Sequence, residues 1–557
     1  MAVETLYQEV DSGKLMDLDE ILGSYGLGRY QVTVCALMGL VLMYSNISPL
    51  SYAITAADVK YRCEIPECED VNDFNKPYNT SWFKSAIPPD NENVDYQKCF
   101  MYPYIGPQNS STENNTKCAS TSFSKNASDL IECKKWVFED TEKTIVTDFS
   151  NIMCDENKWK LSMVGTINSI GQFIGIPLSG FISDKYGRKF IVIIGSVSSA
   201  ILGTMRSFTN GYLSFILFEF LDSVASSGVY GATFVLGLEL VSPKARVTAS
   251  TIMGCFYPMG AVIMGFVAYM VLDWKIMLRI VYLPGLLILG YTWYVPESMR
   301  WLQTQNRIEE MTKILSKVAK SNGKALPPSV REALASNPSI NNNLVNENKL
   351  SFSKLMEKIF DSKEIFLRLI NCSFCWVSIT SVYYGLSLAS IEFYGNRHLN
   401  FMLVNAIEVP AFLTSWYFME HFPRRYTQAG SFLLSGICCI STVNIIPDEY
   451  AWIRLILFLG SKFAITMSFN TIYVFTAEMF PTELRMSLFG IASMFGRLGS
   501  MIAPQIIFLA TIFGKKNVPI VLFGCISFVA GGLAFLFPET KNQKLPDTIK
   551  QAEFINP

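Results

Sequence analysis

The chain of 557 residues is 50% hydrophobic and 13% aromatic, and its formal charge is −1. A charge so close to zero gives no electrostatic support for nucleic-acid binding. A soluble chain of this length would be expected to divide into several domains, but here the apolar residues come in blocks of about 20, the helix length that crosses a bilayer. The composition therefore predicts a multi-pass membrane protein.

Twelve apolar blocks follow one another along the chain, and each predicts a transmembrane helix. They lie roughly at 32–57, 161–183, 190–208, 212–240, 250–272, 276–295, 366–388, 398–420, 428–446, 451–476, 487–512 and 517–537. The segment 1–31 in front of them opens with MAVETLYQEVDSGKLMDLDEIL, which is polar and acidic and does not resemble a cleavable signal peptide. The expected fold class is an all-α membrane protein.

Lysine and arginine concentrate in the short loops on the cytoplasmic side of a membrane protein. Here they follow the second, fourth, eighth and tenth blocks, as Lys185, Arg188, Lys189, Lys244, Arg246, Arg424, Arg425 and Arg485. The even-numbered junctions and both termini are therefore expected in the cytoplasm. This orientation places the long segment 58–159 outside the cell and the protein in the plasma membrane.

The segment 58–159 contains six of the 13 cysteines, namely Cys63, Cys68, Cys99, Cys118, Cys133 and Cys154. An even set of cysteines in an extracellular segment predicts up to three disulfides, whose pairing the sequence leaves open. Glycosylation is expected in the same segment, at the sequons of Asn79, Asn109, Asn114 and Asn126. Sequons at Asn46 and Asn371 fall at or in predicted spans and are interpreted as accidental. The other cysteines are expected to be small buried apolar residues.

Three pairs of short motifs recur at nearly one offset and indicate an internal duplication. GFISDKYGRK after the second block matches WYFMEHFPRR after the eighth, and Pro296-Glu297-Ser298 after the sixth matches Pro538-Glu539-Thr540 after the twelfth. In the third pair, a glutamate at the end of the fourth or tenth block precedes an arginine by the same spacing. The duplication predicts two pseudo-symmetric six-helix bundles, 32–295 and 366–537, of the kind that rock about a midplane site. A cytoplasmic linker, 296–365, would join them, and 538–557 would form a cytoplasmic tail.

The charged motifs at the cytoplasmic ends of these helices could pair in one state and separate in another, which would make a bistable latch. The candidates are Asp184, Gly187, Arg188, Glu239 and Arg246 in the first half, and Glu420, Arg424, Glu478 and Arg485 in the second. The alternative is that these residues only set the topology.

The motif GFISDKYGRK resembles a signature of the major facilitator superfamily. PESMRWL at 296–302, TAEMFPTELR at 476–485, GRLGS at 496–500 and FPETKNQKLPDT at 537–548 resemble solute carrier family 22 more closely. YYGLSL, IEVPAF, FPRRY and SKFAIT are similar to its organic cation/carnitine subgroup. The resemblance covers nearly the whole chain and implies transport of small organic cations, zwitterions or anions.

The resemblance also bears on the class of substrate. At the position of Arg497, the dedicated cation carriers of the family have an acid, whereas anion carriers and carnitine-type carriers have arginine. Anion carriers commonly add a lysine one turn after the acid of the eighth helix. Here that acid is Glu408 and the residue one turn later is Phe412. The pattern favours a zwitterion, with organic anion transport or exchange as the alternative.

Ionisable residues inside a membrane are candidates for function. The predicted spans contain Glu219, Asp222, Glu408, Lys462 and Arg497. Glu408 and Arg497 each fall near the middle of their helices and could face one cavity, where arginine would clamp a carboxylate bidentately and glutamate would attract an ammonium. The alternative is a structural ion pair between the two. Glu219 and Asp222 could pair with Lys462 or Arg206, or line a path for cations.

A quaternary or protonated amine also favours aromatic faces. The candidates for such a cage are Tyr230, Phe234, Tyr257, Tyr383, Tyr384, Phe469 and Tyr473. Asn470 could hydrogen-bond either a substrate or a neighbouring helix. Because aromatics are abundant in this chain, packing between helices or against lipid is the competing interpretation for each of them.

The predicted function is a secondary active or facilitative transporter of small organic cations or zwitterions, such as carnitine or amines derived from amino acids, which works by alternating access. A zwitterion gains nothing from the membrane potential, so its accumulation would need Na⁺ or H⁺ coupling. A cell-surface receptor that uses the segment 58–159 is the alternative of another class. An enzyme, a metal site and a cofactor are not expected, because His398 and His421 are the only histidines and fall on opposite faces. The expected partners are the lipid bilayer and the small substrate, and the oligomeric state stays open.

Overall fold

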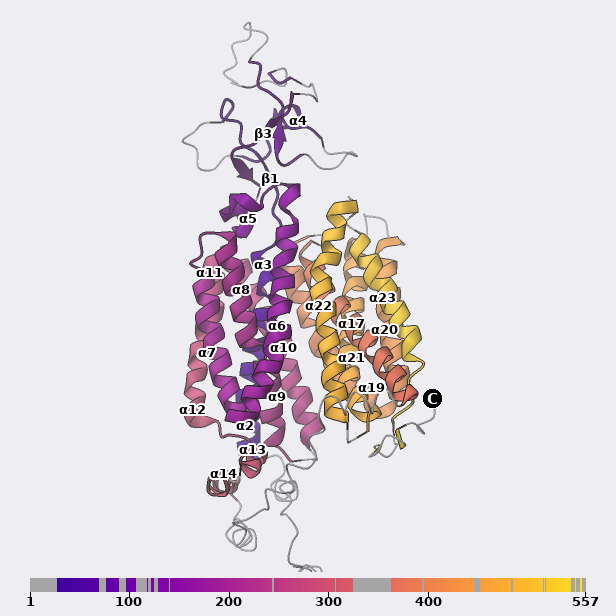
Figure 1. Ribbon diagram of the computed structural model, residues 1–557. Coiled ribbons are helices and arrows are strands. Elements are labelled where there is room, and N and C mark those ends of the chain that lie inside the picture. Colours follow the sequence, from indigo (N-terminus) through magenta and orange to yellow (C-terminus); the bar gives the residue numbers. More distant parts are fainter. Residues whose placement is uncertain are drawn as a thin grey trace, which may run out of the picture.

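The fold is known from a computed structural model. It describes residues 28–69, 77–89, 97–106, 118, 122–124, 129–139, 141–242, 245–305, 307–323, 362–392, 395–444, 451–481, 484–513, 515, 517–541, 546 and 551–552. Two helical bundles lie side by side, and a small cysteine-rich domain stands on one end of the N-terminal bundle (Figure 1). We call this end the loop side. The opposite end, which carries the linker helices α13 (Met299–Thr304) and α14 (Ile308–Ser321), is the linker side.

The N-terminal bundle contains the first six spans, several of which are interrupted. Its helices are α2 (Arg29–Ser45), α3 (Ile47–Thr55), α6 (Trp159–Tyr186), α7 (Arg188–Arg206), α8 (Tyr212–Ser226), α9 (Val229–Glu239), α10 (Arg246–Val271), α11 (Trp274–Tyr282), a 3₁₀ segment (Leu283–Gly290) and α12 (Tyr291–Tyr294). The first span breaks at Asn46, between α2 and α3, and the fourth breaks between α8 and α9. Such breaks free backbone groups inside a membrane protein, where they are tolerated only against protein or a water-filled cavity.

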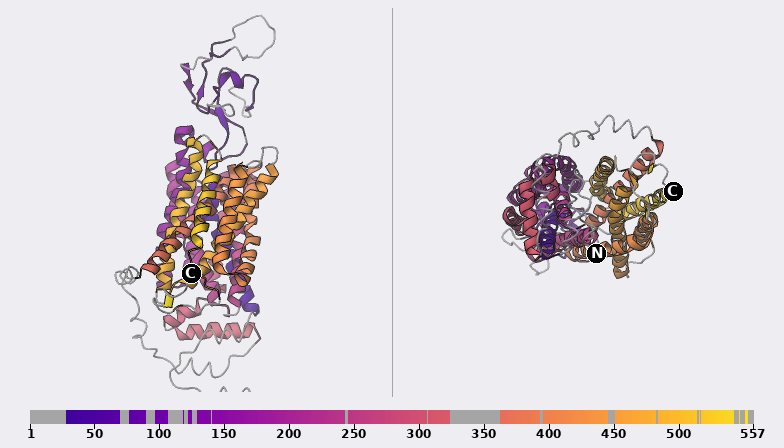
Figure 2. Two further views of the ribbon diagram at one scale, coloured as in Figure 1. Left: turned by 90° about the vertical axis from the view of Figure 1, so that its right-hand side faces the viewer. Right: turned by 90° about the horizontal axis from the view of Figure 1, so that it is seen from below.

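The C-terminal bundle contains the remaining six spans. Its helices are α17 (Lys363–Glu392), α18 (Arg397–Ala406), α19 (Glu408–His421), α20 (Arg424–Asn444), α21 (Ala451–Met479), α22 (Arg485–Phe513) and α23 (Val518–Ala534). Ten helical segments in the described ranges are long and apolar enough to cross a membrane, and α20 and α23 complete the series. Each predicted block thus corresponds to one helical span, which confirms the twelve-helix fold. Seen along the helices, the two bundles form separate groups (Figure 2).

The bundles meet mainly through α6 against α22 and α10 against α18. Thr166 of α6 donates to the Met501 carbonyl at 3.2 Å and accepts from Gln505 at 2.8 Å. Closer to the loop side, Arg397 and His398 at the start of α18 lie 3.5 and 3.3 Å from the Glu142 carboxylate. These contacts between the halves lie from the middle of the bundles to the loop side, so they hold the halves together toward the cysteine-rich domain.

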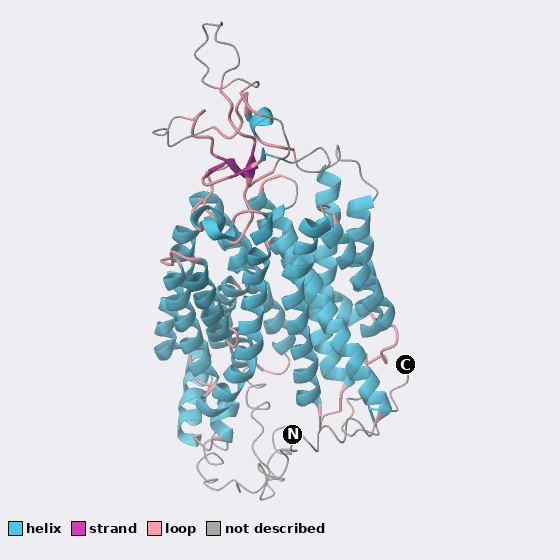
Figure 3. Cartoon of the chain, turned by 45° about the horizontal axis from the view of Figure 1, so that its top comes forward, coloured by secondary structure: helices cyan, strands magenta, loops and turns pink. Residues whose placement is uncertain are grey.

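Strands among the described residues are confined to the cysteine-rich domain (Figure 3). Its elements are β1 (Tyr61–Cys63), α4 (Phe83–Ala86), β2 (Phe100–Met101), β3 (Ile131–Glu132), β4 (Trp136–Phe138) and α5 (Ile145–Asp148). β1 pairs antiparallel with β4, and β2 pairs antiparallel with β3. Disulfides join all six predicted cysteines, as Cys63–Cys133, Cys68–Cys118 and Cys99–Cys154. A domain with sheets this small needs disulfides because its hydrophobic core is too small to stabilise the fold by itself.

The sequons of the cysteine-rich domain differ in what the structure shows of them. Asn79 is exposed to solvent, as a glycosylation site requires. Asn109, Asn114 and Asn126 lie outside the described residues. Their glycosylation stays a prediction.

One close approach in the C-terminal bundle gives a sharp stability prediction. A Cβ at Gly499 of α22 would meet the Val377 carbonyl oxygen and Thr380 Oγ1 of α17, whereas a Cβ at Gly490 of the same helix meets nothing within 4 Å. We expect Gly499→Ala to destabilise the protein by about 1–3 kcal/mol through overpacking. Gly490→Ala should be neutral or stabilising by up to about 1 kcal/mol, because alanine is the better helix former. Thermal unfolding of detergent-solubilised variants measures both, and equal midpoints would contradict the close packing.

Candidate substrate site

Arg497 lies on α22 at the junction of the two bundles and is only partly buried. Its Nη1 donates a hydrogen bond of 2.9 Å to Gln172 Oε1 on α6, across the boundary between the halves. The alternative in which Arg497 pairs with Glu408 is not what the structure shows. A neutral amide holds the guanidinium without neutralising its charge, so Arg497 retains the capacity to bind a carboxylate.

Glu408 has a structural partner in Lys462, and its expected role as a ligand for an ammonium group stays a prediction. Its carboxylate lies 2.8 Å from Lys462 Nζ of α21, and neither side chain has exposed surface. Tyr383 donates to the same carboxylate at 2.7 Å, and Lys462 Nζ also lies 3.3 Å from the centre of the Tyr383 ring. Lys462 further donates to Ser387 at 2.8 Å. The two opposite charges form an ion pair that is fully buried in the C-terminal bundle.

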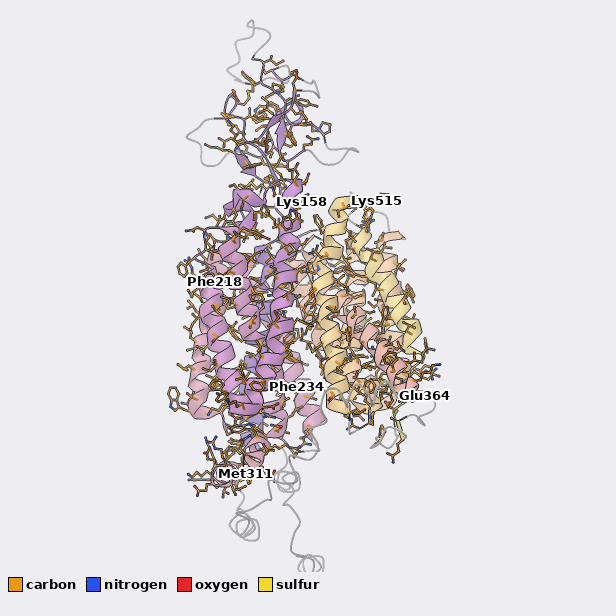
Figure 4. The ribbon with its side chains drawn as sticks, in the orientation of Figure 1. Lys158, Phe218, Phe234, Met311, Glu364 and Lys515 are labelled. Carbon is orange, nitrogen blue, oxygen red and sulfur yellow. A yellow bond between two sulfur atoms is a disulfide. The ribbon has the colours of Figure 1, made fainter. Side chains whose placement is uncertain are left out.

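The N-terminal bundle contributes a group of three aromatic rings. Tyr230 and Phe234 of α9 stack with centroids 6.0 Å apart, and Tyr257 of α10 meets Tyr230 edge-on at 5.1 Å. All three are only partly buried. Phe234 lies on the side of its bundle that faces the C-terminal bundle (Figure 4). This group of rings therefore reaches the boundary between the halves.

The C-terminal bundle contributes a second aromatic group, on α17, α21 and α22. Tyr473 lies edge-on to Trp376 at 4.7 Å and within 5.5 Å of Phe469, and Phe469 lies 5.0 Å from Tyr383. Phe489 of α22 packs on Tyr473 at 5.8 Å. Phe469 and Tyr473 are partly exposed, whereas Trp376 is buried behind them.

The two aromatic groups and Arg497 face one another across the boundary. Tyr230 interacts electrostatically with Tyr473, Tyr384 and Arg497. Tyr257 likewise interacts with Tyr384, Glu408 and Arg497. Hydroxyls from α9 and α10 therefore lie near groups from α17, α21 and α22. The structure thus places predicted aromatic residues of both halves within electrostatic reach of one guanidinium.

Some of the predicted residues serve packing instead. Tyr383 and Tyr384 are almost entirely buried, and Tyr383 is occupied by the Glu408–Lys462 pair. Asn470 donates to Ser415 of α19 at 2.6 Å, which is the neighbouring-helix alternative. Sequence reasoning missed Gln172, Trp376 and Phe489. Trp376 lies two helical turns before Tyr383 on α17, and this spacing could have placed it on the same face.

The two acids of the fourth span lie away from the C-terminal bundle. Glu219 forms an ion pair with Arg206 of α7, one of the two predicted partners. Lys462, the other predicted partner, forms its ion pair with Glu408. Asp222 accepts hydrogen bonds from Ser199 and Tyr282 at 2.5 and 2.7 Å.

The charged motif of the N-terminal half forms a cluster of polar contacts on the linker side, which we call its charge cluster. Asp184 pairs with Arg188 at 3.3 Å, and the Glu297 carboxylate accepts the backbone N–H groups of Arg188 and Lys189 at 2.9 and 3.1 Å. Gly187 between them has φ +105, and a Cβ there would strike Glu297. Burial raises the pKa of the Glu297 carboxyl above its ordinary value, although its backbone N–H donors act in the opposite direction.

The C-terminal half has a charge cluster built from residues at the equivalent positions. Glu539 accepts the backbone N–H groups of Arg424 and Arg425 at 2.9 and 3.1 Å. Glu478 pairs with Arg424 at 3.4 Å and accepts from Thr540 at 2.6 Å. The internal duplication is thus visible in side-chain contacts as well as in the sequence.

The remaining latch candidates lie in or beside the two charge clusters. Glu239 accepts from Ser298, as Glu478 accepts from Thr540. Glu420 is exposed, Arg246 is partly buried, and Arg485 donates to the Phe480 carbonyl at 3.3 Å. In both charge clusters, the contacts described here join residues of the same half. Whether they separate during transport remains a prediction.

Glu297 was noticed in the sequence only as part of a repeated motif, but the structure places it at the start of α7. Removing it in Glu297→Ala leaves the first N–H groups of that helix without an acceptor, and loss of such a cap costs about 0.5–2 kcal/mol. We expect a lower thermal midpoint for this variant. Glu420→Ala, which removes an exposed carboxylate, should leave the midpoint unchanged. A Glu297→Ala protein as stable as the Glu420→Ala control would show that the cap is dispensable.

Comparison with known proteins places the chain in a family. A family model described as "Sugar (and other) transporter" matches residues 101–550. Solute carrier family 22 member 3 of Mus musculus is 30% identical over 439 residues, which cover 78% of this chain and 76% of the relative. The chain belongs to solute carrier family 22. Organic cation/carnitine transporter 2 of Rattus norvegicus is 28% identical over 96% of this chain and 94% of its own.

Solved structures agree on the fold. The partially occluded, inward-open xylose transporter XylE from E. coli superposes with a TM-score of 0.59 at 15% identity, over 93% of this chain and 100% of that one. Another inward-open structure of the same transporter gives 0.54 at 17% identity, over 72% of this chain and 90% of that one. Membership of solute carrier family 22 and this fold make the chain a multi-pass membrane transporter and not an enzyme.

Proposed function

We propose that this member of solute carrier family 22 carries small organic cations and zwitterions, carnitine-like molecules above all, across the plasma membrane by alternating access. The observation that carries the proposal is Arg497, partly exposed between the halves and faced by Tyr230, Tyr257 and Tyr473. A guanidinium binds a carboxylate bidentately, and tyrosine faces attract a quaternary ammonium. Organic cation/carnitine transporter 2, among the relatives, is named for both kinds of cargo.

Phe412 supports the zwitterion over a dicarboxylate. A Cβ at Gly254 of α10 would lie 3.6 Å from the Phe412 ring, so this phenylalanine packs against the opposite half. The second cation that a dicarboxylate would require is absent from that position. Arg497 alone suits a cargo with one carboxylate.

The orientation and the state of the transporter belong to the same proposal. Three disulfides favour an oxidising exterior for the cysteine-rich domain, and the basic residues of the even-numbered junctions favour a cytoplasmic linker side. Both termini would then be cytoplasmic. The polar contacts described between the halves lie from the middle of the bundles to the loop side, which favours a carrier closed to the exterior.

An uptake panel tests the proposal. Cells that express the chain are given radiolabelled carnitine, tetraethylammonium and a dicarboxylate at matched surface expression, with and without sodium. We expect uptake of the first two over the vector control and none of the third. Uptake of the dicarboxylate alone would favour the organic anion alternative, and a protein that binds ligands at its outer domain without moving any would favour the receptor.

A further inference from the structure

A buried cluster in the N-terminal bundle contains two acids for one base. Arg206, Glu219 and Asp222 have no exposed surface. Arg206 forms its ion pair with Glu219, and its Nη2 donates to the hydroxyls of Ser51 and Tyr282 at 2.8 and 3.2 Å. Tyr282 donates in turn to Asp222 Oδ2 at 2.7 Å. A single guanidinium therefore serves two carboxylates.

Asp222 has no ion-pair partner among the residues that the structure describes. Besides Tyr282 of α11, it meets only hydroxyls that the described residues provide, Ser199 of α7 at 2.5 Å and Ser48 of α3 at 3.1 Å. Tyr44 of α2 and Arg206 of α7 also interact with it electrostatically, without a hydrogen bond to its carboxylate. A surplus charge buried in the membrane is expensive unless something neutralises it. The oxygens around Asp222 stand at hydrogen-bond distance and can share a proton with its carboxylate.

A chain of side-chain amides links this cluster to Arg497. Glu219 Oε1 accepts from Asn168 Nδ2 at 2.7 Å, Asn168 Oδ1 accepts from Gln172 Nε2 at 2.7 Å, and Gln172 Oε1 accepts from Arg497 Nη1 at 2.9 Å. Every link runs from donor to acceptor in one direction. The path crosses the boundary between the halves and ends at Arg497, the residue proposed to bind the substrate carboxylate.

We propose that the Arg206–Glu219–Asp222 cluster is a proton-coupling site, which makes the carrier a proton symporter. The proposal rests on the proposed function, because Arg497 has to bind the cargo carboxylate. When that carboxylate draws Arg497 away from Gln172, the amide chain is released and Glu219 loses the Asn168 donor. The cluster then takes one proton from hydronium, whose O–H bond breaks to leave water as a new O–H bond forms on Asp222 or Glu219. By linkage, the proton strengthens cargo binding to the same degree.

The full-length protein in proteoliposomes with a pH-sensitive dye inside provides the test, with carnitine as the probe. An inward carnitine gradient should acidify the lumen, and an inward proton gradient should accumulate carnitine up to about tenfold per pH unit. Asp222→Asn keeps the shape of the side chain and should abolish both effects while retaining carnitine exchange. Gln172→Met cuts the amide chain without touching the cluster and should also uncouple. Glu309→Gln, which removes an exposed carboxylate of α14 outside the latch motifs, is the matched control.

The possible results separate the inference from the function on which it rests. Carnitine uptake by the wild type that moves no protons, or that depends on sodium and ignores pH, overturns the coupling site and leaves the carrier assignment standing. Asp222→Asn and Gln172→Met proteins that remain coupled like the wild type also overturn it. A wild type that transports no carnitine at all overturns the proposed function together with the inference.

Discussion

Replacing Arg497 by alanine should nearly abolish carnitine uptake and spare the uptake of tetraethylammonium. Among the described residues, the wild-type guanidinium is hydrogen-bonded to a neutral amide, Gln172, so it is available to a cargo carboxylate. Truncating one member of a hydrogen-bonded charge pair costs about 2–5 kcal/mol, which corresponds to at least about a 30-fold loss of affinity. A cation without a carboxylate uses only the aromatic faces and should lose little. Initial uptake rates at matched surface expression measure both.

Arg497→Lys is the matched control for charge. Lysine keeps the positive charge but offers no bidentate fork, so carnitine uptake should fall to an intermediate level. If Arg497→Ala moves carnitine as well as the wild type, the guanidinium does not bind cargo. If the variant loses tetraethylammonium equally, Arg497 has a structural role that is independent of the carboxylate.

The second large effect concerns stability. In Lys462→Met or Glu408→Gln, one member of a fully buried ion pair is removed and the other is left uncompensated, which costs about 3–5 kcal/mol. We expect both single variants to lose most of their surface expression and to unfold at clearly lower temperature in detergent.

The double variant Glu408→Gln/Lys462→Met decides whether the pair itself causes the loss. Because it removes both charges, it should recover much of the stability, and the deviation from additivity should exceed the small values seen for independent sites. A Lys462→Met protein with the stability of the wild type, or single losses that simply add, would show that these residues do not act as a pair.

The helices were predictable from the sequence because a run of apolar residues determines a span by itself. The boundaries shifted where the chain breaks inside a span, as at Asn46 and Ile407, since such breaks depend on what packs beside them. The duplicated motifs were also visible in advance. The Glu297 and Glu539 caps behind them were not, because a cap depends on where the next helix begins in space.

The residue types of the candidate site were predictable from the sequence, but their hydrogen-bond and ion-pair partners were less so. Arg497 interacts electrostatically with Tyr230, Tyr257 and Tyr473, and their predicted role in binding cargo stays a prediction. The Glu408–Lys462 pair could not be read from the sequence, because it requires the rotation of α19 and α21 about their axes. Gln172 was invisible for the same reason, since a glutamine in a span carries no charge that would attract notice.

A structure of the full-length protein with carnitine bound, determined by electron cryomicroscopy in a lipid nanodisc, tests the central claim most directly. The account predicts the cargo carboxylate within hydrogen-bond distance of the Arg497 guanidinium, with Gln172 displaced, and the trimethylammonium group against Tyr230, Tyr257 and Tyr473. Carnitine bound elsewhere, while Arg497 keeps its Gln172 partner, would contradict it.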